Sequence, residues 1–285
     1  MSRIAFATCS AHPNGIADDQ RAAELVGAEF RVWDDESVDW HAYDRVVVRS
    51  VWDYTRRLDD FLAWADMVGP GRLRNKTALI RFNADKRYLT QLAVPTVPTA
   101  LLEPGEPLGG YETEIVIKPN VSAGGRDTGR FMPSAAAEAA ALVEHIHKTC
   151  RAALVQPYLP GIDIDGERAV MFFGGEISHV LHKRPVLRDQ GVAPVAGDEH
   201  SPAAIMFEPD LVVPGTASAE QLQLAQRVHN EISARFGQPL FARVDMVPGL
   251  DGSPVLMELE AIEPMLYLEL IPGAAERFAK AVLAA

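Results

Sequence analysis

The sequence has few cysteines and little excess positive charge. Cys9 and Cys150 are its two cysteines, and they are too far apart to suggest a zinc site or a disulfide framework. We expect small, buried or half-buried thiols in a reducing compartment. Lys and Arg total 27 against 39 Asp and Glu, a formal net charge of −12. Nonspecific nucleic-acid binding needs cations that neutralise backbone phosphates, so no nucleic-acid partner is expected.

Long hydrophobic runs are also missing. No stretch approaches the ~20 apolar residues of a membrane span, and the apolar part of "MSRIAFATCSAHPNG" is too short for a signal peptide. We therefore expect no membrane partner and a cytoplasmic location. No Ser, His and Asp set lies in a nucleophile-elbow context, which argues against a hydrolase. With 48% hydrophobic residues, the chain can bury one large core or two to three small ones.

Alternating strand and helix patterns begin the chain and predict a parallel α/β sheet. Strand patterns are 3–8 and 45–50, and helix patterns are 18–30 and 58–68. Asn83 is expected to cap a further helix before the prolines of "AVPTVPT" break the pattern. The predicted domains are 1–93, 94–156 and 157–285.

The central and C-terminal parts read as α+β. We expect a strand, a glycine loop, a second strand and an alanine-rich helix capped by Ser134. A hairpin is expected around Gly174 and Gly175, and residues 185–210 are predicted to be a loop. The C-terminal section is predicted to contain a helix at 218–236, strands at 240–247 and 255–260, and a closing helix.

A glycine loop follows the lysine that ends an apolar strand pattern in "EIVIKPNVSAGGRDTGRF". Backbone amides freed by glycines bind phosphate oxygens, and Lys118 adds a point charge. The loop matches neither a Walker A motif nor a dinucleotide fingerprint. It predicts a polyphosphate site, although a glycine-rich hairpin with a snorkelling lysine fits the same pattern.

Carboxylates alternate along the two C-terminal strands. Arg243 and Asp245 share one face of a strand, as do Glu258 and Glu260. Three acids in apolar surroundings repel one another unless a cation neutralises them. Hard oxygen ligands predict Mg²⁺, completed by nucleotide phosphates. The alternative is a solvated, acidic sheet face.

A basic stretch in this acidic chain suggests a third site, for a carboxylate or a transferring phosphoryl group. A solvated basic edge is the alternative. The residues concerned are His182, Lys183, Arg184, Arg188 and, on the partner strand of the predicted hairpin, Arg168.

In this order, the motifs resemble those of ATP-grasp ligases. Lys86 and Lys118 are similar to the family's nucleotide lysines, and "LVQPYLPGID" is similar to its adenine hinge. "ARVDMV" and "MELEAIEP" resemble its two metal strands. The resemblance implies an α/β and α+β fold of three lobes, with ATP held between two α+β lobes. It also implies Mg²⁺ and a small amino-acid substrate.

The resemblance assigns roles residue by residue. It implies catalytic Arg168, Lys183 and Arg243, and metal ligands Asp245, Glu258 and Glu260. The implied nucleotide-binding residues are Lys86, Lys118, Ser122, Gly124, Gly125, Gln156, Pro157, Tyr158, Leu159 and, on the ribose, Asp163. Glu260 replaces the family's usual asparagine, and "EPMLYLE" replaces its Ser-Pro-Gly turn, which alters the wall of the substrate pocket.

Within the family, "VRSVWDY" and "LEAIEP" are most similar to the cyclo-ligases that act on O-ureido-serine in cycloserine biosynthesis. Ring closure within one amino acid is then expected, with Arg49, Ser50, Trp52 and Asp53 holding the substrate, although Trp52 is also compatible with a core position. An intermolecular peptide or glutathione-like ligase and a non-catalytic nucleotide-binding module remain alternatives. A homodimer is possible on the same resemblance.

Overall fold

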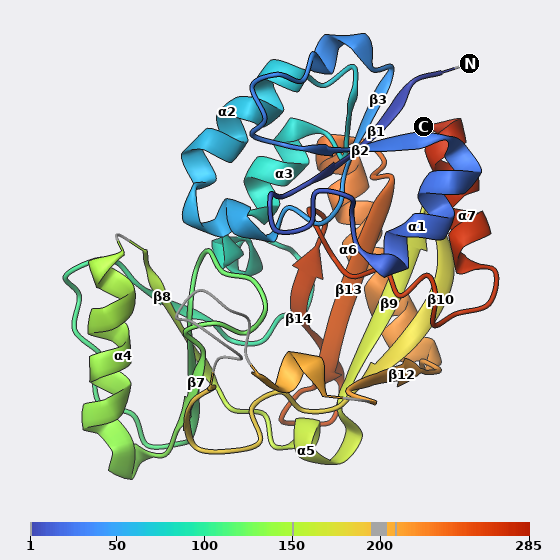
Figure 1. The fold of residues 1–285 in the computed structure, drawn as a ribbon. Coiled ribbons are helices and arrows are strands. Elements are labelled where there is room, and N and C mark those ends of the chain that lie inside the picture. Colours follow the sequence, from blue (N-terminus) through green and yellow to red (C-terminus); the bar gives the residue numbers. More distant parts are fainter. Residues whose placement is uncertain (1, 150, 195–203, 209) are drawn as a thin grey trace.

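The part of the chain that the structure describes forms three β-sheets (Figure 1). The computed structural model describes residues 2–149, 151–194, 204–208 and 210–285. Cys9 is buried, whereas Cys150 lies outside the described residues. No helix in the described ranges is long and apolar enough to cross a membrane.

The N-terminal lobe has a four-stranded parallel sheet, as the sequence predicts, in the order β2-β1-β3-β4. Its strands are β1 (Ile4–Thr8), β2 (Ala28–Val32), β3 (Arg45–Val48) and β4 (Leu73–Arg74). Its helices are α1 (Ala17–Val26), α2 (Leu58–Val68) and α3 (Thr77–Asn83). The helix expected over 18–30 is too long: Gly27, with φ of 66°, ends α1, and the following residues pair with β1 as β2.

The expected cap at Asn83 is wrong. Asn83 is the last residue of α3, and Asp85 caps the next element, the 3₁₀-helix Lys86–Thr90. The Asn83 side chain instead donates to Leu259 O at 2.8 Å and accepts from Ala261 N at 2.7 Å. It therefore pairs with backbone C=O and N–H groups at the edge of a strand that is far away in the sequence.

The central lobe has an antiparallel sheet in the order β11-β7-β6-β8-β5, with one face covered by α4 (Figure 1). The elements are β5 (Ala100–Leu102), β6 (Ile115–Pro119), β7 (Gly129–Phe131), α4 (Ala136–Lys148), β8 (Ala153–Pro157) and β11 (Gly191–Val192). Ser134 is not the cap of α4. It lies within the preceding 3₁₀-turn Pro133–Ala135, and Ala135 occupies the cap position without a side-chain hydrogen bond.

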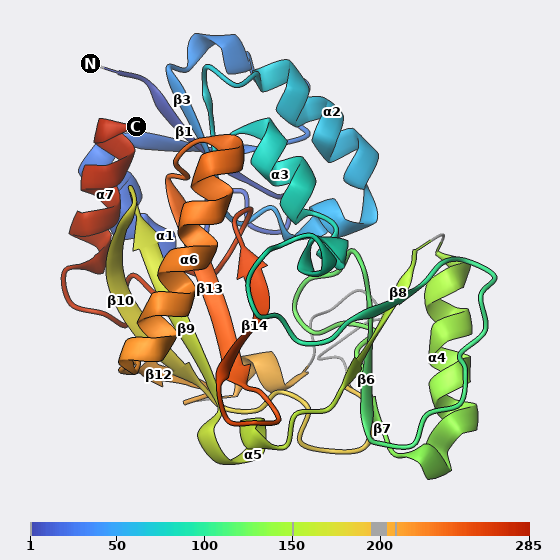
Figure 2. The same ribbon diagram turned by 180° about the vertical axis from the view of Figure 1, so that it is seen from behind.

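The C-terminal lobe has a five-stranded antiparallel sheet in the order β12-β10-β9-β13-β14. Its elements are α5 (Gly161–Asp165), β9 (Glu167–Phe173), β10 (Glu176–Lys183), β12 (Val212–Pro214), α6 (Ala219–Phe236), β13 (Phe241–Pro248), β14 (Pro254–Glu260) and α7 (Ala274–Ala284). The predicted hairpin around Gly174 and Gly175 is confirmed by the pairing of β9 with β10. Helix α6 covers one face of the sheet, while α7 and α1 lie at its other side (Figures 1 and 2).

The loop expected over 185–210 is partly ordered into regular structure. Its described part contains β11, which joins the central sheet, and the 3₁₀-helix Ala204–Phe207. Residues 195–203 and 209 lie outside the described ranges. Strand β10 belongs to the C-terminal sheet and β11 to the central sheet, so the described first part of this connection runs from one sheet to the other.

Candidate active site

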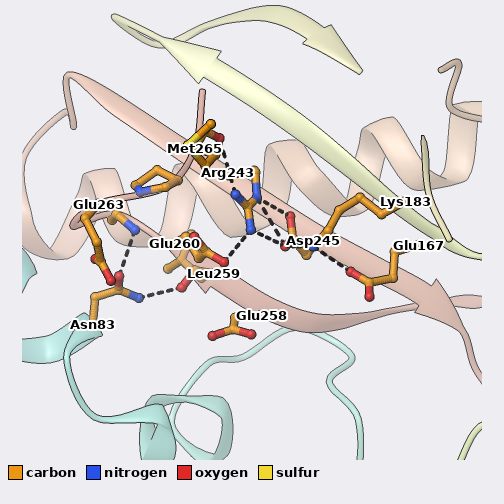
Figure 3. Close-up of polar contacts among 12 residues, drawn as sticks. Asn83, Glu167, Lys183, Arg243, Asp245, Glu258, Leu259, Glu260, Glu263 and Met265 are labelled. Carbon is orange, nitrogen blue, oxygen red and sulfur yellow. Dashed lines mark hydrogen bonds and ion pairs between the residues drawn. The ribbon is translucent and has the colours of Figure 1, made fainter. Parts of the chain in front are cut away.

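Strands β13 and β14 bring four charged side chains onto one face of the C-terminal sheet. In the antiparallel register, Arg243 lies opposite Glu260 and Asp245 lies opposite Glu258. Alternation along each strand then directs all four to the same side, as the sequence pattern predicts. Figure 3 shows a row of charges made by Glu260, Arg243, Asp245, Lys183 and Glu167, with Glu258 beside it; Lys183 comes from β10 and Glu167 from β9.

The centre of this row is a buried ion-pair network. Lys183 Nζ lies 2.9 Å from an oxygen of Glu167 and 2.9 Å from Oδ2 of Asp245. Arg243 Nε donates to Asp245 Oδ1 at 2.9 Å, and its Nη2 also bonds Glu260. Burial alone would raise the pKa of Asp245, but Arg243 and Lys183 outweigh it and lower that pKa to about 2. Asp245 is therefore ionised at neutral pH.

Lys86 connects the glycine loop to the acidic strand. Its Nζ donates to Ser122 O at 2.6 Å and lies 3.2 Å from Glu258 Oε1. Asn120 O accepts the backbone N–H of Lys86 at 2.7 Å, which holds the base of the loop against the 3₁₀-helix. Ser122, at the start of the loop, is thus tied to an acid of β14 through one lysine.

Lys118 is buried without a hydrogen-bond or ion-pair partner among the described residues. Its side chain lies on the face of β6 opposite the α4 core, since Ile115 and Ile117 occupy the α4 side. Burial lowers its pKa, and the like charge of Lys86 lowers it further against the opposing effect of Glu258. A buried ammonium in this condition favours binding of an anion.

Ionisation of Glu260 is opposed by its surroundings. Burial, with repulsion from Asp245 and Glu258, raises the pKa of Glu260 to about 7 despite Arg243. Glu258 and Glu260 remain 23% and 29% exposed, so both stay open to a ligand. The described residues contain no group of three His, Cys, Asp or Glu side chains placed to hold a metal by themselves.

This donor set fits a Mg²⁺ ion that also binds phosphate. Mg²⁺ commonly takes one or two protein carboxylates and completes its shell with phosphate oxygens and water. Asp245 and Glu258 are paired across β13 and β14. All three acids that the sequence places at the metal have protein cations as partners, namely Lys183 and Arg243 at Asp245, Lys86 at Glu258 and Arg243 at Glu260.

The residues expected at the adenine lie along β8 and just after it. Gln156 is on the same face of the central sheet as Lys118 and donates to Thr99 Oγ1 at 2.8 Å. Pro157 ends β8, and Leu159 is buried against Val97 and Val247. Tyr158 donates to Asp163 Oδ1 at 2.5 Å. The hinge segment is thus brought near Lys118, while Asp163 is engaged with a protein side chain.

The glycine loop turns on left-handed backbone and is docked onto the N-terminal lobe. Gly124 and Gly125 have φ of 66° and 69°, a region that favours glycine. Beyond them, Arg126 Nη2 donates to Thr55 Oγ1 at 2.9 Å. Thr55 belongs to the 3₁₀-helix Trp52–Arg56, so the loop reaches across to the lobe that carries the expected substrate residues.

The basic stretch does not form one site. Arg168 and His182 pair on the face opposite Lys183 and Asp245, and Arg168 Nη1 donates to Asp165 O. Arg188 is paired with Glu208, 2.8 Å away, and the backbone N–H of Arg184 donates to Leu211 O. Glu167, the neighbour of Arg168, joins Lys183 in the buried ion-pair network instead. Sequence reasoning missed it, although its place directly opposite Lys183 in a correctly aligned hairpin would have indicated it.

The expected substrate residues are used in different ways. Arg49 is 1% exposed, and its guanidinium bonds Asp19 and Pro264 O. Ser50 is buried and hydrogen-bonds Thr8. Asp53 accepts from Trp33 and Arg57. Trp52 donates from Nε1 to Glu263 O at 3.2 Å, directly beside the row of charges.

Two α+β lobes facing each other, with paired lysines on one side and acids on the other, define the class of ATP-grasp enzymes. The fold resembles that of D-alanine–D-alanine ligase from Bacillus anthracis in complex with ATP, with a TM-score of 0.65 at 14% identity over 100% of this chain and 97% of that one. A RimK domain ATP-grasp protein from Sphaerobacter thermophilus gives a TM-score of 0.63 at 17% identity, covering 99% of this chain and 100% of that one.

Other relatives are more similar in sequence. Residues 4–75 match the family described as the N-terminal domain of D-cycloserine synthetase DcsG. The cycloserine biosynthesis protein DcsG of Streptomyces lavendulae is 33% identical over 280 residues, covering 92% of this chain and 90% of the relative. The crystal structure of D-cycloserine synthetase DcsG has a TM-score of 0.84 at 30% identity and covers 99% of this chain and 98% of that one. The chain belongs to the DcsG family of ATP-grasp ligases.

Proposed function

We propose that this protein is an ATP-dependent ligase that closes the ring of D-cycloserine from O-ureido-D-serine. The observation that carries the proposal is the 33% identity to DcsG across nearly the whole chain. The row of charges supports it, because Lys118, which is buried and has no hydrogen-bond or ion-pair partner among the described residues, interacts electrostatically with Glu258, one of the acids suited to Mg²⁺. ATP would lie between the lobes predicted at 94–156 and 157–285.

Lys86 and Lys118 would bind phosphate oxygens of ATP, with the backbone of the loop from Ser122 to Gly129 closing over them. Asp245 and Glu258 would hold Mg²⁺. When bound, this ion neutralises the negative charge of the phosphoryl group during its transfer. Arg243, fixed by Asp245 and Glu260, would place the substrate carboxylate in line with the γ-phosphate. The other contributions of the protein are to orient the substrate and to exclude water from the acylphosphate.

The reaction has two bond-exchange steps and a hydrolysis. A carboxylate oxygen of the substrate takes the γ-phosphoryl group, so the bond from phosphorus to the β-bridging oxygen breaks and ADP leaves. The nitrogen joined to the side-chain oxygen then attacks the acyl carbon and loses its proton, forming the C–N bond of a five-membered ring. Phosphate departs with the former carboxylate oxygen. Water then cleaves the carbamoyl group from the ring nitrogen, which regains a hydrogen, and the carbamic acid released breaks down to CO₂ and NH₃. Arg243 is the cation placed to stabilise the charge that develops on the acyl oxygen.

Transfer of ¹⁸O from substrate to phosphate tests this route. The protein is incubated with Mg²⁺, ATP and O-ureido-D-serine labelled with ¹⁸O in its carboxyl group. One labelled oxygen is expected in each inorganic phosphate released during turnover. Unlabelled phosphate during turnover would rule out the acylphosphate.

Acceptor dependence tests ring closure. A ring-closing enzyme needs one amino acid, so ADP release should be complete without a second amine. A requirement for a separate amine would instead indicate an intermolecular ligase. ATP binding without ADP release on a broad amino-acid panel would indicate a binding module.

A further inference from the structure

The segment that follows β14 is held along its backbone by side chains from two lobes. Trp52 and Arg49 come from the N-terminal lobe, and Arg243 and His179 come from the C-terminal sheet. Each donates to one carbonyl of consecutive residues: Glu263 O at 3.2 Å, Pro264 O at 3.1 Å, Met265 O at 3.3 Å and Leu266 O at 3.0 Å. The path of this segment is thereby fixed, and with it the direction of the side chains that it carries.

Glu263 lies at the end of the row of charges, beyond Glu260 and beside Asn83 (Figure 3). Asp245, Glu258 and Glu260 each have a lysine or arginine partner. In the ranges that the structure describes, the Glu263 carboxylate has none. Burial, followed by repulsion from Glu260, raises its pKa to about 8. A cation bound beside it would lower that pKa and favour the charged carboxylate.

The other acids near the substrate end of the cleft are already engaged. Asp53 accepts from Trp33 and Arg57, and Asp19 is buried beneath Arg49. An α-amino acid carries an ammonium group one carbon away from its carboxylate, and burying that group without an acidic partner is costly. Of these acids and Glu263, Glu263 is the one without a cationic partner among the described residues. Arg243 bonds the carbonyl of Met265, two residues further on, so the cation for the carboxylate is close by.

We propose that Glu263 binds the α-ammonium group of the amino-acid substrate whose carboxylate lies at Arg243. This inference rests on the proposed ligase function and adds its substrate-recognition residue. Mg²⁺ is the other cation that an acid here could attract. Trp52 of the N-terminal lobe donates to Glu263 O, whereas Lys86, which would bind phosphate, is paired with Glu258. Glu263 is therefore assigned to the substrate ammonium rather than to Mg²⁺.

Steady-state kinetics of Glu263→Gln test the assignment in the full-length enzyme. KM for O-ureido-D-serine should rise roughly 10–100-fold, as expected for loss of a charge-assisted hydrogen bond, while KM for ATP stays unchanged. Glu269→Gln is the matched control. It removes the same charge from an exposed position on the same segment and should leave both values unchanged.

Binding of two ring compounds separates recognition from a structural effect. In the presence of Mg²⁺ and ADP, the wild-type enzyme should prefer D-cycloserine to isoxazolidin-3-one, which has the same ring without the ammonium group. Glu263→Gln should abolish that preference by weakening D-cycloserine alone. Equal weakening of both compounds, or a higher Mg²⁺ requirement with unchanged substrate KM, would overturn the inference.

The proposed function can fail separately. A wild-type enzyme that neither turns over O-ureido-D-serine nor binds D-cycloserine would overturn the ligase assignment, and this inference with it. Wild-type turnover with an unaltered Glu263→Gln variant would overturn only the role of Glu263.

Discussion

The hydroxyl of Tyr88 bonds both backbone groups of Leu259. It donates to Leu259 O at 3.0 Å and accepts from Leu259 N at 2.8 Å. Leu259 separates Glu258 from Glu260, and β14 is an edge strand of its sheet. The buried Tyr88 hydroxyl thus pairs with the backbone of the unpaired edge of β14, at the residue that lies between the two acids.

Tyr88→Phe should lower stability and activity together. The change leaves the buried N–H of Leu259 without its partner, at a cost of about 1–3 kcal/mol, whereas Leu259 O keeps its hydrogen bond from Asn83. Thermal unfolding and kcat with saturating ATP check this. Tyr111→Phe removes a hydroxyl that bonds Met132 O near the surface and serves as the control. Identical melting temperatures for the two variants would contradict the role given to Tyr88.

Lys118→Ala should weaken ATP binding at least tenfold without destabilising the protein. A unit charge pair 4 Å apart is worth roughly 4 kcal/mol at an effective dielectric of 20. The unbound lysine is buried with no partner in the described residues, so its removal costs no ion pair. Isothermal titration with ATP and thermal unfolding measure the two effects, with exposed Lys280→Ala as the control. Unchanged ATP affinity would remove Lys118 from the phosphate site.

Asp245→Asn should reduce kcat by roughly 10²–10³-fold or more while the fold persists. Lys183 keeps Glu167 and Arg243 keeps Glu260, so neither cation is left unpaired. Turnover is measured at saturating Mg²⁺, with Asp251→Asn in the β13–β14 turn as the control. Normal turnover under these conditions would exclude Asp245 as a metal ligand.

Stability should fall on acidification because of His179. Burial lowers the pKa of His179 from 6.5 to about 4. The unfolded chain therefore binds a proton that the native protein does not, and stabilisation present above pH 6.5 is lost as the pH falls to about 4. The full shift corresponds to about 3 kcal/mol. Urea unfolding at pH 7 and pH 4.5 should show a smaller loss for His179→Gln. Equal losses in variant and wild type would contradict the assignment.

Strand alternation was enough to predict which face carries the acids. Arg243, Asp245, Glu258 and Glu260 lie two apart within their strands, and pairing of the two strands preserves that pattern. The hairpin at Gly174 and Gly175 was predictable for a similar reason, since the turn residues lie between two apolar runs. Local chemistry therefore indicated the acidic side of the site.

Contacts between distant segments were not predictable in this way. Glu167 and Arg168 are neighbours in the sequence, and the register of β9 decides which one meets Lys183. Asn83 resembles a helix cap, yet its amide is used by a strand 176 residues away. The end of α1 depended on whether Gly27 takes a left-handed conformation, which a helical pattern alone does not reveal.

The hydroxyl of Thr55 accepts a hydrogen bond from Arg126 and its carbonyl accepts one from Arg151, so one residue holds both the glycine loop and the segment between α4 and β8. The same 3₁₀-helix begins at Trp52, which touches the segment carrying Glu263. On the proposed function, parting of the lobes to release ADP would break these hydrogen bonds. We therefore expect turnover to slow in viscous solvent, with the exit of products setting its pace.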